Sequence, residues 1–139
     1  MAQRVSSIMT PAPVTIRPGQ TVADAARIMR DHGIGNVLVV ENDALAGMIT
    51  DRDIVVRAVA NGRDPAATPA GDICSRDLVT VRPDEDAQAA VARMRQHGVR
   101  RVPVVSEGSP VGILSIGDLA VEKDSESALA DVSARPPNT

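Results

Sequence analysis

The chain has 139 residues, of which 43% are hydrophobic and 24% charged, and its formal net charge is −3. This profile is that of one ordinary soluble domain, or of two small halves that share one core. The acidic balance argues against a general nucleic-acid binder. The absence of Phe, Tyr and Trp also removes the rings on which single-stranded nucleic acids stack.

No apolar run approaches the roughly 18 residues that a membrane helix needs. The N-terminal stretch MAQRVSSIMTPAP lacks the apolar segment of a secretory signal, so we expect a cytoplasmic protein. The single cysteine, Cys74, cannot form an internal disulfide, which agrees with a reducing compartment.

An internal repeat organises the chain. Shifted by 65 residues, the sequence aligns with itself without a gap from Ile8/Ile73 to about Asp53/Asp118. VTIRP meets VTVRP, and MRDHGIGNVLVV meets MRQHGVRRVPVV. One copy of such a repeat rarely buries its apolar face alone, so we expect the two copies to pack on each other and complete a single core.

Within the first copy the signals run strand, helix, strand, strand, helix. Thr21 is a candidate N-cap, and His32 with Gly33 suits the end of the same helix. The segment ENDALAG predicts the turn of a hairpin. In chain order these elements are expected at 14–16, 22–32, 36–40, 47–50 and 51–60.

The second copy predicts helices over 84–96 and 116–123. A Gly/Pro/Ala-rich connection, 61–72, lies between the copies, and the last ten residues have little apolar surface to bury and are expected to be disordered. The predicted organisation is repeat 1 at 6–60, a linker at 61–70, repeat 2 at 71–123 and a C-terminal tail at 124–139.

These segments together resemble a tandem pair of CBS domains, the Bateman module. The resemblance rests on HG-containing segments that end in LVV or PVV and on two Ghh[ST]xxD segments, GMITDRD and GILSIGD. ITDRDIV and RRVPV are similar to segments of stand-alone bacterial two-CBS proteins of the mycobacterial hypoxic-response type. The resemblance implies a mixed α/β (α+β) fold of two β-α-β-β-α repeats. It also implies sheets packed about a pseudo-twofold axis, and a homodimer.

In this family each repeat supplies part of two clefts that bind adenosine compounds such as AMP, ADP, ATP or S-adenosylmethionine. Each cleft combines the [ST]xxD segment of one copy with the strand entrances of the other. By position, the main cleft would comprise Thr50, Arg52, Asp53, Cys74, Val79, Val99, Arg100, Arg101 and Pro103. The second cleft would comprise Met9, Val14, Ile34, Gly35, Asn36, Ser115 and Asp118.

The Thr50-x-x-Asp53 spacing has two interpretations. A Ser or Thr followed three residues later by an acid is a capping box at a helix start. The family resemblance instead assigns Asp53 and Asp118 to ribose, and Thr50 and Ser115 to phosphate or ribose. We favour ligand binding because the resemblance extends over nearly the whole chain.

The two expected clefts are unequal. Arg100 and Arg101, with Arg52, offer a phosphate clamp in the main cleft, since guanidinium groups bind phosphate in a bidentate way. Gly35 and Asn36 stand at the positions of the paired arginines in the second cleft. We therefore expect phosphorylated nucleotide in the main cleft, and weak binding, a neutral ligand or no ligand in the second. By resemblance, adenine would lie between apolar walls such as Val79, Val99 and Ile49.

Other motifs favour a structural interpretation. Cys74 with His32 or His97 could suggest a nucleophile pair, but both histidines occupy the same helix-end position and fit capping. The sequence has no recognised metal-ligand spacing, no Gly-rich phosphate loop and no nucleophile elbow. We therefore expect no enzyme, no metal and no required cofactor, but a regulatory protein with an unknown partner. The alternative is a ligand-free interaction or dimerisation protein with vestigial clefts.

Overall fold

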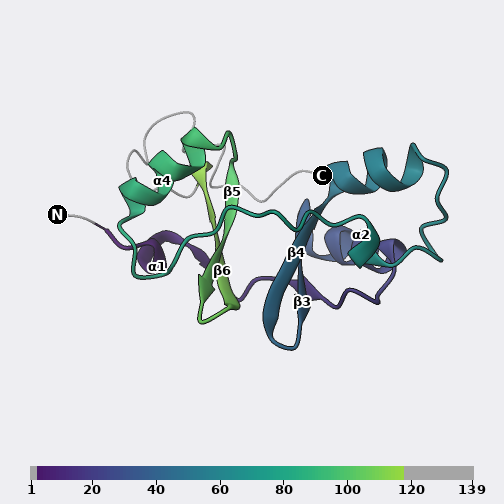
Figure 1. The fold of residues 1–139 in the computed structure, drawn as a ribbon, viewed down its shortest axis with the longest axis horizontal. Coiled ribbons are helices and arrows are strands. Elements are labelled where there is room, and N and C mark those ends of the chain that lie inside the picture. Colours follow the sequence, from purple (N-terminus) through teal and green to yellow (C-terminus); the bar gives the residue numbers. More distant parts are fainter. Residues whose placement is uncertain (1–2, 118–139) are drawn as a thin grey trace. The chain divides into compact units, whose positions relative to one another are not determined.

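The structure, a computed structural model, describes residues 3–117 (Figure 1). The strands form two three-stranded sheets, and helices accompany each of them. In chain order the elements are α1 (Val5–Ile8), β1 (Thr10–Pro11), β2 (Thr15–Ile16), α2 (Val22–His32), β3 (Asn36–Glu41), β4 (Ala44–Thr50), α3 (Asp51–Asp53), the π-helix η1 (Ile54–Val59), the 3-10 helix η2 (Ala70–Asp72), α4 (Ala87–Gln96), β5 (Arg101–Ser106) and β6 (Ser109–Ser115). The expected mixed α+β class is confirmed.

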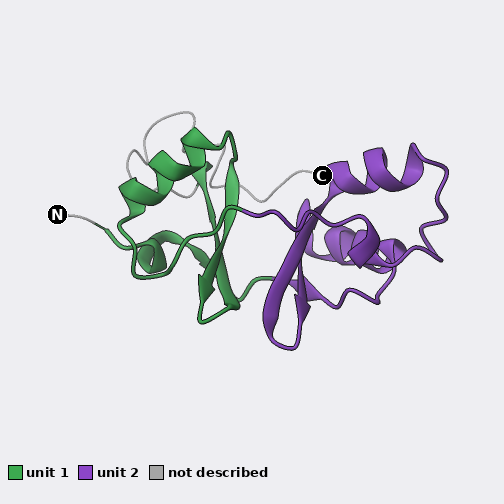
Figure 2. Ribbon diagram, in the orientation of Figure 1, with its two compact units in different colours: residues 1–13, 79–136 green, residues 14–78, 137–139 purple. Residues whose placement is uncertain are grey.

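The chain divides into two compact units (Figure 2). Each unit has one sheet and its own core, in place of the single core expected from the repeat. Among the described residues, unit 1 comprises 3–13 and 79–117, and unit 2 comprises 14–78. Unit 1 contains the sheet β1-β6-β5, and unit 2 contains the sheet β2-β3-β4. The core of unit 1 includes Val5, Met94 and Leu114. The core of unit 2 includes Val37 and Ile49.

Each unit contains the first segment of the other unit's repeat. In unit 1, β1 from the first copy pairs antiparallel with β6 of the second copy, with Thr10 opposite Ile113. In unit 2, Ser75 from the start of the second copy bridges Met48 in β4. Each compact unit is therefore built from parts of both sequence repeats.

The helix predicted from Thr21 forms between its expected ends. Thr21 and Asp24 make both hydrogen bonds of a capping box, and Gly33 ends the helix with a left-handed φ of 63°. Glycine suits this position because it has no Cβ to clash. The local sequence signals therefore decide both ends of α2.

Four expectations about individual helices and strands need correction. Strand β4 begins at Ala44 rather than at residue 47, because Asn42 and Asp43 both take positive φ and close a two-residue hairpin turn. The helix expected over 84–96 begins at Ala87, because the Asp86 side chain caps it. The helix expected over 51–60 is α3 continued by a π-helix, in which the Ala60 N–H donates to Val55 O.

The fourth correction concerns short elements that the sequence signals did not predict: α1, β1 and η2. Each has four residues or fewer, too few for periodicity to appear. The helix expected over 116–123 and the tail expected to be disordered extend beyond the last described residue, 117. Within the described part of the chain, no helix is long and apolar enough to cross a membrane.

The connection between the copies packs on its own unit. The Val22 and Ala23 N–H groups in the first turn of α2 donate to Thr68 O at 2.9 Å and Pro65 O at 3.0 Å. Thr68 is 5% exposed, and its hydroxyl donates to Asp64 O at 2.7 Å. The connection thus supplies acceptors that the start of a helix otherwise lacks.

Candidate functional site

The Thr50–Asp53 pair lies where β4 passes into α3. The Asp53 N–H donates to Thr50 Oγ1 at 3.0 Å, and the Thr50 N–H donates to Asp53 Oδ2 at 3.0 Å. The capping box is therefore present, as one of the two interpretations predicts. The Asp53 side chain is 15% exposed, so it is mostly but not fully buried.

The cap does not use all of the hydrogen-bonding capacity of this pair. A carboxylate has about four acceptor sites, and a hydroxyl that accepts one bond can still donate its own hydrogen. The capping box takes one bond at Asp53 Oδ2 and one at Thr50 Oγ1. Acceptor sites on Asp53 and the Thr50 O–H are left for a diol or a phosphate.

Arg57 lies beside this pair, one helical turn after Asp53. Its Nε is 3.7 Å from Asp53 Oδ1, and its Nη1 donates to Ile73 O at 3.2 Å. Half of the Arg57 side chain is exposed. Arg57 was not among the predicted site residues, although its spacing of four from Asp53 is the spacing of an ion pair on a helix.

Cys74 belongs to the same unit and packs against β4. The segment after Ile73 joins the strand through two backbone hydrogen bonds, Met48 N–H to Ser75 O at 2.9 Å and Ser75 N–H to Met48 O at 2.8 Å. Burial raises the pKa of the Cys74 thiol above its ordinary value, while the nearby Arg76 opposes this shift. Unit 2 thus brings together Thr50, Asp53 and Cys74.

The other predicted site residues are divided between the two units, and each unit holds residues of both expected clefts. In unit 2, Asn36 is opposite Thr50 on the neighbouring strand, and the Asp51 N–H donates to Gly35 O at 3.0 Å. Each unit contains the [ST]xxD segment expected for one cleft and the strand entrance expected for the other. Unit 2 holds Val14, Ile34, Gly35, Asn36, Thr50, Arg52, Asp53 and Cys74, and unit 1 holds Met9, Val79, Val99, Arg100, Arg101, Pro103 and Ser115.

Ser115 is opposite Arg101 in unit 1, which mirrors the Asn36–Thr50 pair of unit 2. Asp118, expected to hold ribose in the second cleft, lies outside the described residues.

Three arginines expected to clamp phosphate, Arg52, Arg100 and Arg101, are exposed. Among the residues that the structure describes, none of the three guanidinium groups has an ion-pair partner within 4.0 Å. Their charges are therefore available to an anion. Ile49 differs from expectation: it is fully buried in the core of unit 2, so its side chain is not available as a wall for adenine.

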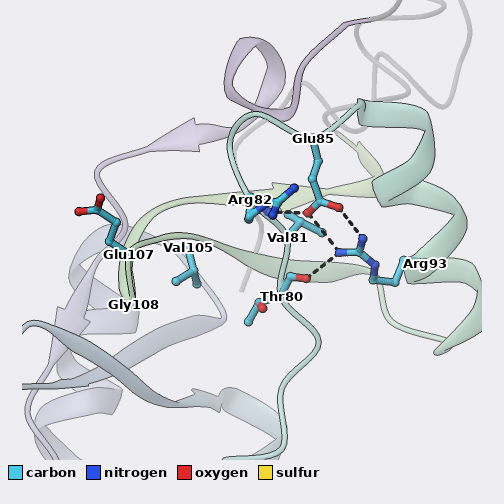
Figure 3. Close-up of a pocket in the computed structure, with 8 residues that line it drawn as sticks. All are labelled: Thr80, Val81, Arg82, Glu85, Arg93, Val105, Glu107 and Gly108. Atoms are coloured by element: carbon cyan, nitrogen blue, oxygen red, sulfur yellow. Dashed lines mark hydrogen bonds and ion pairs between the residues drawn. The ribbon is translucent and has the colours of Figure 1, made fainter.

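Unit 1 also contains a pocket of about 480 Å³ near the turn of the β5–β6 hairpin (Figure 3). Its charged wall is an ion pair in which Arg93 donates to both carboxylate oxygens of Glu85, and Arg93 also donates to Thr80 O at 2.9 Å. Glu85 further accepts the Arg82 N–H at 2.6 Å. These groups are occupied with one another, so we interpret the pair as a structural link between α4 and the segment before it.

The described residues contain no group of three or more His, Cys, Asp or Glu side chains that could hold a metal ion.

The sequence matches the CBS domain family over residues 5–59 and again over 70–123. The chain belongs to the CBS domain family. It is 41% identical over 133 residues to the CBS domain-containing protein YhcV of Bacillus subtilis, with 93% of this chain and 94% of the relative covered. It is 38% identical over 114 residues to hypoxic response protein 1 of Mycobacterium tuberculosis, with 81% and 80% covered. The tandem CBS arrangement inferred from the repeat is confirmed.

Solved structures of CBS proteins share the fold. Hypoxic response protein I, crystallised with two coordinated zinc ions, matches with a TM-score of 0.78 at 36% identity, over 86% of this chain and 98% of that one. A hexameric CBS-CP12 protein from bloom-forming cyanobacteria matches with a TM-score of 0.76 at 31% identity, over 92% and 77%. The CBS domain pair of protein MJ0100, in complex with 5-methylthioadenosine and S-adenosylmethionine, matches with a TM-score of 0.80 at 25% identity, over 91% and 100%.

Proposed function

We propose that this CBS pair is a non-catalytic regulatory module that binds an adenosine-containing ligand of the AMP, ADP or ATP class and signals to a partner protein. The observation that carries the proposal is the hydrogen-bonding capacity left at Thr50 and Asp53 after the capping box is made. The complex of the MJ0100 pair with two adenosine compounds supports the ligand class. Asp53 would accept the two ribose hydroxyls, and the Thr50 hydroxyl would donate to the ligand.

The phosphate part of the proposal rests on Arg52, Arg100 and Arg101, whose guanidinium groups are exposed and have no ion-pair partner among the described residues. Val79, Val99, Cys74 and Pro103 complete the proposed set. A bound ligand stabilises the conformation that binds it, by RT ln(1 + [L]/Kd). This shift of population is the signal that a partner protein would detect.

The test is thermal unfolding, followed by circular dichroism because the chain has no Tyr or Trp, with AMP, ADP, ATP and S-adenosylmethionine. At a ligand concentration of 100 Kd, binding adds about 2.7 kcal/mol to the free energy of unfolding. We expect Asp53→Ala to abolish the ligand-dependent rise in melting temperature.

The control is Asp24→Ala, because Asp24 has the same place in the capping box of α2 that Asp53 has in that of α3. Both variants lose a cap and melt at a lower temperature, but Asp24→Ala should keep the full response to ligand. A wild-type protein that responds to no member of the panel would leave Thr50 and Asp53 as a helix cap only. The ligand-free interaction protein would then be the better interpretation.

We also propose that the protein forms a homodimer through the exposed face of η1. Val55, Val56 and Val59 are the large hydrophobic residues that are exposed among the described residues, at 59%, 49% and 59%. A second copy would bury these valines, and the hexameric CBS-CP12 relative shows that a protein of this fold can self-associate. Sedimentation equilibrium should give a dimer for the wild type and a monomer for Val59→Lys. A wild-type monomer at high micromolar concentration would contradict the proposal.

A further inference from the structure

Arg57 is close to Asp53 but is not hydrogen-bonded to it through Nε. The distance of 3.7 Å from Nε to Oδ1 exceeds that of an N–H···O hydrogen bond, so Asp53 keeps its acceptor capacity while a positive charge lies beside it. A guanidinium group has five N–H donors, and the hydrogen bond recorded for Arg57 is the one from Nη1 to Ile73 O. That bond holds the charge in place next to the candidate site.

Arg57 completes the charge balance of the segment that begins at α3. From the start of α3 to Arg57, the charged residues are Asp51, Arg52, Asp53 and Arg57, with a formal sum of zero. Without Arg57 this segment has a formal sum of −1, which is less favourable for an anionic ligand at Asp53. Half of the Arg57 side chain is exposed, so its attraction for an anion acts through solvent and weakens with added salt.

The repeat makes this position different in the two copies. Shifted by 65 residues, Arg57 corresponds to Glu122 in the sequence. The two copies therefore carry opposite charges at the same place in the repeat. The residue of the second copy therefore suggests Arg57→Glu as the substitution that reverses the charge in the first copy.

We propose that Arg57 is a specificity-determining residue, which makes the Thr50–Asp53 site prefer adenosine compounds with an anionic group over neutral or cationic ones. This inference rests on the proposed function of that site. The physical basis of this preference is Coulombic. The positive charge of Arg57 attracts a phosphate group and repels a sulfonium or ammonium group, and neither effect depends on how the adenosine part of the ligand is bound.

Calorimetric titration with a charge series tests the inference. The series is 5-methylthioadenosine, S-adenosylmethionine, AMP, ADP and ATP, and the variants are Arg57→Gln, Arg57→Glu and Arg57→Lys. For Arg57→Gln we expect the Kd of ATP to rise about tenfold and that of AMP to rise less, while the Kd of 5-methylthioadenosine changes by less than about twofold. Arg57→Glu should raise the Kd of ATP further and lower the Kd of S-adenosylmethionine. Arg57→Lys should keep the wild-type order of the five Kd values.

The matched control is Arg63→Gln, which removes a partly exposed arginine from the same unit, one that is paired with Asp72. It should leave all five affinities unchanged. An equal loss for every ligand in Arg57→Gln, or no loss for any, overturns the inference while leaving the proposed function in place. A wild-type protein that binds none of the five compounds overturns both.

Discussion

Cys74 lies directly against Gly47, so that a Cβ added to Gly47 would stand 2.7 Å from the Cys74 Sγ and 2.8 Å from Ser75 O. The second copy repeats this close approach with different residues: a Cβ on Gly112 would stand 2.6 Å from the Met9 Sδ. In each unit, the segment that begins the other copy of the repeat therefore packs on a strand at a glycine. Only glycine leaves room for the backbone of that segment to approach the sheet.

The first prediction concerns these glycines. Gly47→Ala and Gly112→Ala should each lower the free energy of unfolding by about 1–3 kcal/mol, because the added methyl group forces apart two packed segments. Gly19→Ala is the control, since no atom lies within 4 Å of a Cβ at that position. Urea unfolding followed by circular dichroism measures all three variants. Equal urea midpoints for Gly47→Ala and Gly19→Ala would show that the Cys74 segment does not pack tightly on Gly47.

The second prediction concerns the Cys74 thiol, whose pKa is raised mainly by burial. At pH 8 the thiolate fraction is therefore small, and alkylation by iodoacetamide should be at least about tenfold slower than in the urea-unfolded chain. Because the folded pKa lies above the unfolded one, the contribution of the thiol to stability is complete at neutral pH. It is lost as the pH rises from the unfolded value through the folded one. Mass spectrometry of the labelled protein over time gives the rate, and equal rates would contradict this description of the site.

The third prediction concerns the ion pair of unit 1. The hydrogen bond from Arg93 holds the pKa of Glu85 below its usual value, with burial acting in the opposite direction. The ion pair therefore contributes its full stabilisation of the fold above the unfolded-state pKa of Glu85. This contribution is lost as the pH falls through the lowered pKa that Glu85 has in the folded state. Arg93→Ile should cost about 1 kcal/mol at pH 7 and progressively less in acid.

The first copy supplies the matched substitutions for this test, because Gln20 and Ile28 occupy the positions of Glu85 and Arg93. Adding Glu85→Gln to Arg93→Ile should recover part of the loss, since no carboxylate is then left without its partner. A strictly additive double-mutant cycle at pH 7 would show that the two side chains do not interact in solution.

The fourth prediction concerns the connection between the copies. The Val22 and Ala23 amides donate to carbonyls of the connection, whereas the Gln88 amide in the first turn of α4 has no partner among the described residues. Hydrogen exchange should therefore be slow at Val22 and Ala23 and fast at Gln88. Thr68→Val, which removes the buried hydroxyl bond to Asp64 O, should speed exchange at Val22 and cost about 1 kcal/mol. Fast exchange at Val22 in the wild type would mean that the connection is not held on α2.

Much of each repeat was predictable because its signals are local. Thr21 and Gly33 mark both ends of α2 through bonds and dihedral angles within a few residues, and the β-branched run beginning at Asn36 becomes a buried strand. The spacing of Thr50 and Asp53 correctly predicted the capping box. The repeat itself indicated the family, because two copies at a fixed offset are improbable without a common fold.

The π-helix after Asp53 shows where local signals were not enough. Helical spacing over 51–60 predicted a helix, but periodicity does not distinguish hydrogen bonds to the fifth residue from those to the fourth. In the structure the η1 segment takes this wider turn, and Ala58 within it is fully buried.

The sequence by itself determined the repeat, the resemblance to the CBS family and the ends of α2, because these depend on the order of residues along the chain. Only the tertiary structure decided that β1 pairs with β6 of the other copy, that Thr68 and Pro65 accept bonds from α2, and that Arg57 donates to Ile73 O. These contacts join residues far apart in the chain, and no periodicity or spacing records them. They depend on which backbone groups and charges are left without partners once the separate elements have formed.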